Sequence, residues 1–239
     1  MHRFYASSEN IVGNNLTLEA DETRHLRDVL RMSVEDEVSV FNGGGAEFRC
    51  KILEIGKRSS LLRISEEIEP ASPESNLDLT LAAAIVNGEK YDLVIQKAVE
   101  LGVTTFVPLQ TIRCDVKLMD AVKRLDRWRR IALEATKQCG RAKLMRVAEP
   151  CVFEAIVGGT DPQNVILFSE REGKTFSTVS AGKKITALIG PKGGWDDSEL
   201  EKARSSGVNI VTLGGRILRA ETAAISLTTI LQHRFGDLN

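Results

Sequence analysis

Two arginines and one glutamate follow a pair of glycines late in the sequence, and their side chains could do chemistry. They are Arg216, Arg219 and Glu221, just after Gly214 and Gly215. A guanidinium group is permanently charged and its planar fork can reach an oxygen atom, so it can stabilise negative charge. A carboxylate can hold an arginine in place or accept a proton. The alternative is a surface ion pair between Glu221 and one arginine, although the segment carries more charge than a connection needs.

A second segment, residues 190–194, reads Gly-Pro-Lys-Gly-Gly. Glycine has no side chain, so the backbone N–H and C=O groups of this segment can approach a ligand closely. The segment lacks the spacing of the Walker loop, G-x-x-x-x-G-K-[ST], and of the dinucleotide fingerprint, G-x-G-x-x-G. Asp196 and Asp197 follow, where the start of a helix favours carboxylates. A ligand-binding loop and a plain connection between a strand and a helix both stay open.

Covalent and metal chemistry find little support in the sequence. It contains no G-x-S-x-G motif, and its four cysteines lie far apart without a C-x-x-C pair. The three histidines are not spaced to hold a metal ion together. We therefore expect no metal site, no disulfide framework and a reducing, cytoplasmic location.

The elements that must position these residues change in character near residue 70. The first part is expected to be mostly β, with a hairpin turn at residues 42–45, because asparagine and glycine tolerate positive φ. One helix, with Leu26 on its apolar stripe, interrupts the strands. Residues 69–76 are rich in proline and serine and indicate a linker.

After the linker, apolar strands alternate with helices, which indicates an α/β fold with a parallel sheet. Thr222 is expected to cap the last helix. The expected strands are residues 77–86, 103–109, 165–168, 185–189 and 208–213, and the expected helices are residues 90–101, 119–139, 196–205 and 221–234. Ligands of open parallel sheets bind at the carboxyl ends of the strands. Residues 167–170, 189–194 and 213–222 stand at such ends.

Composition is that of an ordinary globular chain, with 239 residues, 42% hydrophobic and 27% charged, and a net charge of −1. The longest purely apolar run, residues 81–86, is too short to cross a bilayer, and we expect no secretory signal. Charge is unevenly distributed. Residues 113–146 carry eleven Lys and Arg against four Asp and Glu, a net charge of +7. This stretch could attract a polyanion, or it could be a solvated basic helix face.

The segments 189–194 and 213–223 together resemble the paired cofactor motifs of the SPOUT methyltransferases. More narrowly, the chain resembles the bacterial 16S ribosomal RNA uridine-N3 methyltransferase family over nearly its whole length. It departs from that family at Lys192, where a glutamate is usual, and at Ile112 and Cys114, where a Glu-Arg-Ser run is usual. Further segments that carry the resemblance are residues 1–4, 25–31, 41–45, 96–103, 127–141 and 232–238.

The resemblance implies an N-terminal PUA-like β-barrel, residues 1–72, that binds RNA. It implies a SPOUT α/β domain, residues 73–239, with a C-terminal trefoil knot that binds S-adenosylmethionine. It also implies a homodimer, to which apolar residues of the last helix would contribute. The implied reaction is methyl transfer to N3 of a uridine in 16S ribosomal RNA of the small subunit. The alternatives are a catalytically impaired RNA-binding dimer of the same fold, a methyltransferase acting on another RNA site, and a domain that binds an unrelated nucleotide.

Carried onto this sequence, the resemblance also implies roles for single residues. Arg219 and Arg113 are the candidates for stabilising a negatively charged uracil, and Glu221 for holding an arginine or accepting the proton. The implied cofactor-binding residues are Phe168, Ser169, Ile189, Gly190, Pro191, Gly193, Gly194, Leu213, Gly214, Ile217, Leu218, Arg219 and Thr222. The implied RNA contacts are Arg3, His25, Arg31, Arg129, Arg130 and Arg141.

Overall fold

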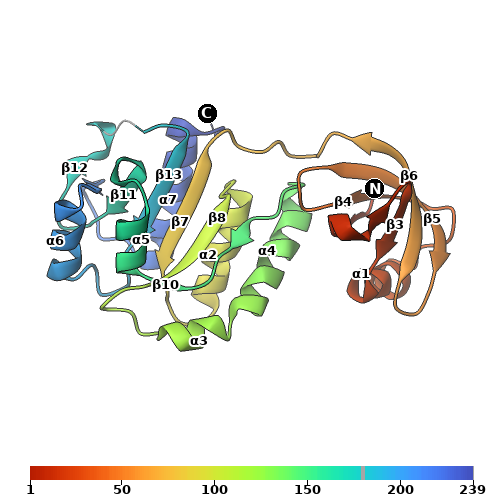
Figure 1. Cartoon of the computed structure of the whole chain (residues 1–239), viewed down its shortest axis with the longest axis horizontal. Coiled ribbons are helices and arrows are strands. Elements are labelled where there is room, and N and C mark those ends of the chain that lie inside the picture. Colours follow the sequence, from red (N-terminus) through yellow and green to blue (C-terminus); the bar gives the residue numbers. More distant parts are fainter. Residues whose placement is uncertain (179–180, 239) are drawn as a thin grey trace. The chain divides into compact units, whose positions relative to one another are not determined.

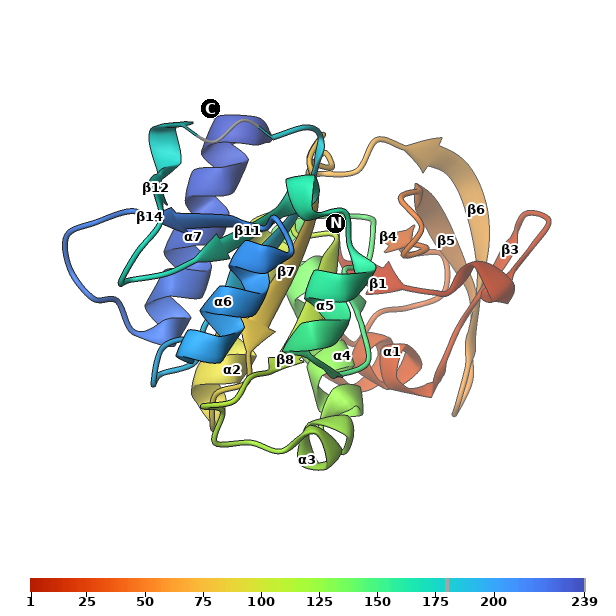
Figure 2. The same cartoon turned by 60° about the vertical axis from the view of Figure 1, so that its left-hand side comes forward.

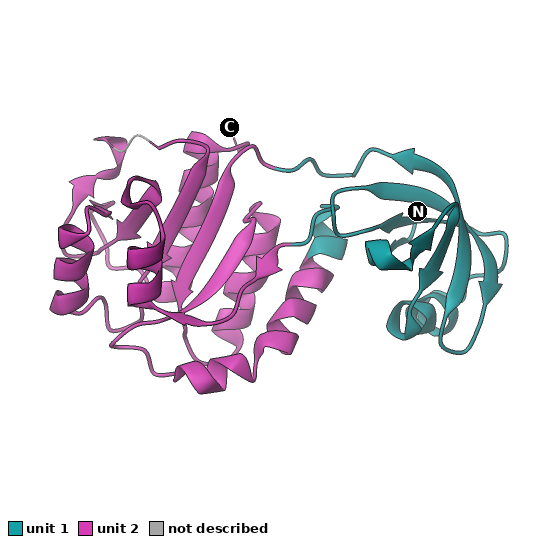
Figure 3. Cartoon of the chain, viewed as in Figure 1, with its two compact units in different colours: residues 1–74, 136–144 teal, residues 75–135, 145–239 magenta. Residues whose placement is uncertain are grey.

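The computed structural model describes residues 1–178 and 181–238. The chain forms two compact units (Figure 3). The first, here the N-terminal unit, comprises residues 1–74 and 136–144. The second, the C-terminal unit, comprises residues 75–135 and 145–239. The segment 136–144 therefore packs with residues that precede it by more than sixty positions.

The N-terminal unit is built on a six-stranded sheet with the order β1-β4-β5-β6-β3-β2. Its strand pairs are antiparallel except for the parallel pair of β1 and β4. The strands are β1 (Arg3–Tyr5), β2 (Ile11–Val12), β3 (Asn15–Leu18), β4 (Glu37–Phe41), β5 (Glu47–Ile55) and β6 (Ser60–Ile68). Alternate side chains of these strands fill one core, which includes Phe4, Leu16, Leu18, Val38, Val40, Ile52 and Leu62.

The expected hairpin joins β4 to β5. The side chain of Asn42 accepts hydrogen bonds from the backbone N–H groups of Gly44, at 2.8 Å, and Ala46, at 3.1 Å. Gly43 has a φ of 76°, which glycine adopts without strain. The helix expected among these strands begins as α1 (Ala20–Arg24) and continues as the π-helical η2 (His25–Val29), and Leu26 points into the core. A short 3-10 turn, η1 (Ser8–Asn10), completes the unit.

The C-terminal unit is built on a parallel sheet, as the alternating pattern predicts. Its strand order is β10-β8-β7-β13-β11-β14-β12, with β9 beside β8. The strands are β7 (Asp78–Ala84), β8 (Thr105–Gln110), β9 (Arg146–Val147), β10 (Cys151–Val152), β11 (Val165–Phe168), β12 (Lys174–Thr175), β13 (Lys184–Ile189) and β14 (Asn209–Thr212). Strand β11 is a continuous apolar run, and β7 and β13 are mostly apolar and buried after their first residue, because both faces of the sheet are covered.

Helices cover both faces of this sheet (Figures 1 and 2). Helices α5 (Phe153–Gly159) and α6 (Asp197–Ser205) lie on one face, and α2 (Glu89–Glu100) and α7 (Ala220–Phe235) lie on the other. Two 3-10 turns, η3 (Pro162–Asn164) and η4 (Phe176–Thr178), lie in the connections. No helix within the described residues is both long and apolar enough to cross a membrane.

One helix prediction needs correction. The expected helix over residues 119–139 is two helices, α3 (Leu118–Val122) and α4 (Leu125–Cys139). The chain turns at residues 123 and 124, where the N–H of Arg124 donates to the carbonyl of Ala121 at 2.9 Å. This turn allows Ala121 and Leu125 both to be buried, which outweighs continuation of the helix.

The strand order explains where a site can form. Strand β13 lies between β7 and β11, and β11 lies between β13 and β14. In register, Phe168 pairs with Ile189 on one side and with Val211 on the other. The carboxyl ends of β11, β13 and β14 are therefore side by side, which is the edge where open parallel sheets bind ligands.

Candidate functional site

A cavity of about 340 Å³ opens at these three strand ends. Its walls are formed at the ends of three strands, by residues 168–170 at β11, 189–194 at β13 and 211–218 at β14, and by Ala220, Ala223 and Leu227 of α7. The volume lies within the range of pockets that hold small organic ligands. All of these residues belong to the C-terminal unit.

Most of the residues expected to bind a cofactor line this cavity. They are Phe168, Ser169, Ile189, Gly190, Pro191, Gly193, Gly194, Leu213, Gly214, Ile217 and Leu218. Arg219 and Thr222 are not among the lining residues. Thr222 is also not the helix cap, because α7 begins at Ala220 and Arg219 takes the cap position without a side-chain hydrogen bond.

Nine further residues line the cavity without being singled out as cofactor-binding residues. Five of them lie within the segments 167–170, 189–194 and 213–222, namely Glu170, Lys192, Gly215, Arg216 and Ala220. The other four, Val211, Thr212, Ala223 and Leu227, lie outside those segments and were not expected from the sequence. Glu170 directly follows the expected pair Phe168 and Ser169 at a strand end, so its position carried a signal for it. Ala223 and Leu227 carried no such signal, because the sequence pattern of an apolar helix face is the same whether that face packs on the sheet or on a ligand.

The glycines of the 190–194 loop have different reasons to be glycine. A Cβ on Gly190 would lie 3.0 Å from the buried ring of Trp195. Gly194 has a φ of +70°, and a Cβ there would lie 2.5 Å from a carboxylate oxygen of Glu170. A Cβ on Gly193 would make only ordinary contact, at 3.4 Å from the Cβ of Arg113. Gly190 and Gly194 are thus required by the fold, whereas a Cβ on Gly193, which lines the cavity, would meet only the side chain of Arg113.

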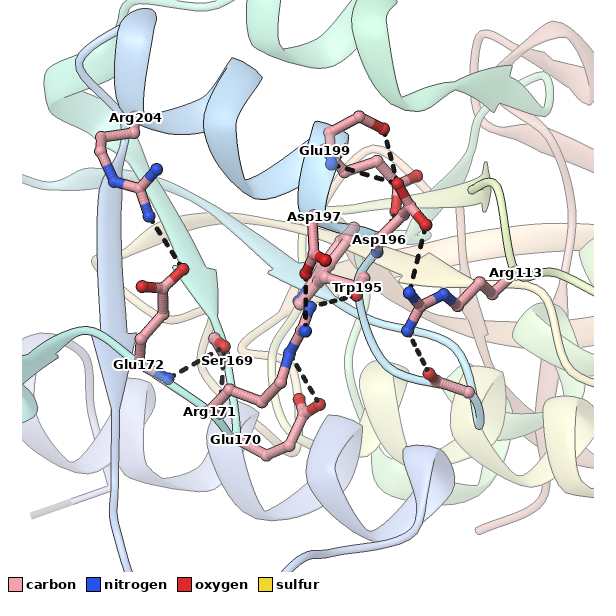
Figure 4. A network of polar contacts seen from close by, with 12 residues as sticks. Arg113, Ser169, Glu170, Arg171, Glu172, Trp195, Asp196, Asp197, Glu199 and Arg204 are labelled. Carbon is pink, nitrogen blue, oxygen red and sulfur yellow. Dashed lines mark hydrogen bonds and ion pairs between the residues drawn. The ribbon is translucent and has the colours of Figure 1, made fainter.

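Arg113 lies against this loop, with its side chain 40% exposed. Its guanidinium donates to the carbonyl oxygen of Gly193 and to the carboxylate of Asp196, each at 3.1 Å (Figure 4). Asp196 caps α6 by accepting from the backbone N–H of Ser198, and Glu199 completes the capping box. The hydrogen bonds from Ser198, and with them that from Arg113, lower the pKa of Asp196.

Glu221 has a different partner from the one expected. It forms an ion pair with Lys90 of α2, with 2.9 Å between Nζ and Oε1, and not with a neighbouring arginine. Its pKa is lowered, first by a hydrogen bond from its own backbone N–H and then by Lys90. Arg219, two residues earlier in the chain, is exposed and adds to this shift by its charge.

Two of the arginines expected to contact RNA are used inside the N-terminal unit. Arg3 donates to both carboxylate oxygens of Glu47, at 3.0 and 2.9 Å, and to the carbonyl of Arg141 at 2.7 Å. The side chain of Arg141 is 3% exposed and forms an ion pair with Glu74 at 2.7 Å. Both side chains therefore hold the fold together, where exposed contacts were expected, and we do not carry them forward as RNA contacts.

The other four residues expected to contact RNA are on surfaces or near them. His25 packs edge-on against Phe4, with ring centroids 6.0 Å apart. Arg31 is exposed and has a positive φ of 53°. Arg129 pairs with Glu149 at 2.9 Å, with its side chain 49% exposed, and Arg130 is exposed beside it on α4.

Comparison with known proteins agrees with this architecture. Residues 73–232 match the model of the RNA methyltransferase domain family, and residues 18–65 match the model of the RNA methyltransferase PUA domain. The chain is 33% identical to ribosomal RNA small subunit methyltransferase E of Aquifex aeolicus over 235 residues, which covers 98% of this chain and 100% of that protein.

Solved structures share the fold over the full length. The enzyme of the same name from Neisseria gonorrhoeae, solved bound to S-adenosyl methionine, is 31% identical with a TM-score of 0.89, covering 100% of both chains. A Legionella pneumophila protein solved with bound SAM is 33% identical with a TM-score of 0.90, covering 99% of this chain and 98% of that one. From the matched domains and this full-length similarity, the chain belongs to the RNA methyltransferase family, with a PUA domain before its methyltransferase domain.

Proposed function

We propose that this protein transfers a methyl group from S-adenosylmethionine to N3 of a uridine in 16S ribosomal RNA. The observation that carries the proposal is the glycine-lined cavity at the ends of β11, β13 and β14. Relatives that align over the full length are named as small-subunit ribosomal RNA methyltransferases, and one of them was solved with S-adenosyl methionine.

The cavity suits the chemical parts of S-adenosylmethionine. Phe168, Ile189 and Leu218 offer apolar contact to an adenine ring. Glu170 can accept hydrogen bonds from hydroxyl or ammonium groups, and Lys192 and Arg216 can pair with a carboxylate. When bound, this cofactor supplies an electrophilic methyl group on a positively charged sulfur. The protein has to orient the two reactants and stabilise the charge on uracil.

Arg219 is the residue we assign to charge stabilisation. Methylation at N3 requires loss of the N3 proton, and a permanent positive charge favours the resulting anion. Glu221 is held by Lys90 and its pKa is lowered, so its carboxylate is ionised at neutral pH and is a weaker base than an ordinary glutamate. We therefore assign Glu221 a positioning role: its ion pair holds the first turn of α7 and places a negative charge near Arg219. We do not assign it to accepting the proton.

Replacing Arg219 with alanine tests that assignment. We expect kcat to fall about 10- to 150-fold, which corresponds to the loss of one hydrogen bond to a charged group. The dissociation constant for S-adenosylmethionine should change by less than about threefold, because Arg219 does not line the cavity. Steady-state methylation kinetics and calorimetry give the two values. A variant with normal kcat and weak cofactor binding would assign Arg219 to the cofactor instead.

We propose RNA contacts separately for each unit, from Arg31 and His25 in the N-terminal unit and from Arg129 and Arg130 in the C-terminal unit. Arg31 carries the stronger argument. A non-glycine residue with positive φ costs about 1 kcal/mol or more, and such strain often marks a functional position. Arg31 lies two residues after the end of η2, and π-helical turns are frequent at functional sites.

Replacing Arg31 with glycine should have different effects on the stability of the protein and on its recognition of RNA. Glycine relieves the strain, so we expect the free energy of unfolding to stay equal or to rise by up to about 1 kcal/mol. Methylation of the cognate site should fall about tenfold, because a contact to RNA is lost. Glu35 has a φ of 78° and an exposed ion pair with Lys51, so Glu35→Gly is the matched control. Equal methylation by both variants would remove Arg31 from the RNA site.

A methylation assay on small ribosomal subunits that lack the modification tests the function as a whole. Transfer of label, mapped to N3 of one uridine, is the expected result. Cofactor binding without transfer would favour an RNA-binding dimer that has lost the reaction. Transfer to another nucleotide would keep the enzyme class and change the target.

Three further properties belong to this proposal. We propose a homodimer, supported by exposed apolar side chains at Ile217, Leu213 and Leu218, of which Ile217 is 83% exposed; sedimentation at micromolar concentration tests it. Within α7, by contrast, Ala224, Leu227 and Leu231 are buried in the protomer.

We also propose a trefoil knot in the C-terminal unit, to be checked by chain tracing in an experimental structure. A cytoplasmic location follows from the ribosomal substrate and is checked by cell fractionation.

A further inference from the structure

The loop that forms one wall of the cavity is held from two sides by arginines of other segments (Figure 4). The loop runs from Gly190 to Asp197, where α6 begins. Arg113 reaches it from the segment after β8, and Arg171 reaches it from the segment after β11. Both guanidinium groups donate to backbone carbonyls of the loop and to carboxylates at the start of α6.

On one side, Arg113 donates to the carbonyl oxygen of Gly193 and to Asp196. Its stem also packs on the loop, because the position of a Cβ on Gly193 is 3.4 Å from the Cβ of Arg113 and 3.6 Å from its Cδ. Next to this contact, Glu199 accepts from the backbone N–H of Ile112 at 2.9 Å. The segment around Arg113 is therefore itself fixed to α6.

On the other side, Arg171 donates to the carbonyl oxygen of Trp195 and to Asp197, the latter at 2.7 Å. This charge pairing raises the pKa of Arg171. The indole of Trp195 donates to the carbonyl of Phe168 at 2.8 Å and is fully buried. Arg171 lies 3.9 Å from the carboxylate of Glu170, which lines the cavity.

Such a loop needs outside support. Glycine residues lose more conformational freedom on ordering than any others, so a loop with three of them does not hold one shape by itself. A hydrogen bond to a carbonyl fixes the plane of its peptide group. Holding the carbonyls of Gly193 and Trp195 therefore fixes two peptide planes, the one between Gly193 and Gly194 and the one between Trp195 and Asp196. Gly194, whose φ is positive, lies between these two fixed planes.

We propose that Arg113 and Arg171 are positioning residues that hold the 190–197 loop in the shape that binds S-adenosylmethionine. This inference rests on the proposed function for the identity of the ligand. It assigns Arg113 to the loop and not to the uracil anion. It adds Arg171, whose part in the site could not be expected from its place in the sequence.

The variants Arg113→Met and Arg171→Met test this, because methionine keeps much of the apolar stem and removes the donors. The matched control is Arg204→Met, which removes ion pairs to Glu172 and Glu201 in the neighbouring network but no contact to the loop. Calorimetry with S-adenosylmethionine should show about tenfold weaker binding for each loop variant and no change for the control. With saturating cofactor, kcat of the Arg171 variant should stay within about twofold of wild type.

Hydrogen exchange of the unliganded protein gives a readout that does not depend on the cofactor. The amides of Gly194 and Asp196 donate within the loop region, at 2.9 Å to Pro191 and at 2.9 Å to Glu199, so their protection reports loop order. We expect faster exchange of these amides in both loop variants and unchanged exchange in Arg204→Met. Unchanged exchange and affinity in the loop variants would overturn the inference.

Calorimetry and hydrogen exchange together also separate this inference from the proposed function. If wild-type protein does not bind S-adenosylmethionine, the proposed function fails, and hydrogen exchange still decides whether the arginines hold the loop. If Arg113→Met loses kcat at saturating cofactor while affinity and exchange are unchanged, Arg113 acts on the RNA substrate and its assignment as a positioning residue is wrong.

Discussion

Replacing Gly193 with valine is expected to abolish measurable S-adenosylmethionine binding while the protein stays folded. The fold tolerates a side chain here, since a Cβ would meet Arg113 at an ordinary 3.4 Å and the residue has no positive φ. The isopropyl group would lie beside the cavity that Gly193 lines. We expect affinity to fall about 100-fold or more, the upper end of what overpacking costs. Calorimetry measures the affinity, and the thermal melt of the unliganded protein reports folding.

Valine substitutions at the neighbouring glycines would not test the position of the cofactor. Valine at Gly194 would be strained by the positive φ and would meet Glu170, so lost binding could reflect lost structure. A suitable control is Gly158→Val in α5, where the position of a Cβ has open space around it. Unchanged affinity in the Gly193 variant would move the cofactor away from the 190–194 loop.

Replacing Arg3 with methionine should cause the largest loss of stability among the substitutions considered. Glu47 is 3% exposed, and its carboxylate would be left buried without its cationic partner. The backbone carbonyls of Thr136 and Arg141 would lose a donor as well. Breaking a buried ion pair from one side costs about 3–5 kcal/mol. Chemical denaturation of the full chain measures the change in the free energy of unfolding.

A second substitution shows whether the loss comes from the unpaired carboxylate. In the double variant Arg3→Met, Glu47→Leu both charges are absent, and most of the lost stability should return. If the single variant unfolds like wild type and only RNA binding weakens, Arg3 is an RNA contact, as the sequence suggested, and its internal contacts matter little.

The parts of the fold that follow from local pattern could be predicted from the sequence. The turn at Asn42 needs only its own side chain and the glycines beside it, and β11 and β13 need only an apolar run of the right length. Because the three glycine-rich or charged segments follow such strands, their meeting at one edge of the sheet could also be expected. The cavity then forms there with Phe168 and Gly190 in its walls.

The parts that depend on distant partners could not be predicted. Arg3 and Arg141 look like free surface charges in the sequence, because Glu47 and Glu74 lie 44 and 67 positions away. Glu221 has arginines near it in the sequence, yet it pairs with Lys90 of another helix. Long-range pairing of this kind depends on tertiary packing, which neither periodicity nor local spacing records.

The place of β13 in the sheet affects how the protein is made. Its neighbours β7 and β11 both precede it in the chain, so on the ribosome they emerge before the strand that joins them. Until β13 is synthesised, the facing edges of both strands lack their partner, and unpaired edges are where chains aggregate. The cavity needs β14 as well, the last strand of all. A nascent chain therefore acquires its binding site only near the end of translation, so ligand binding reports completion of the sheet.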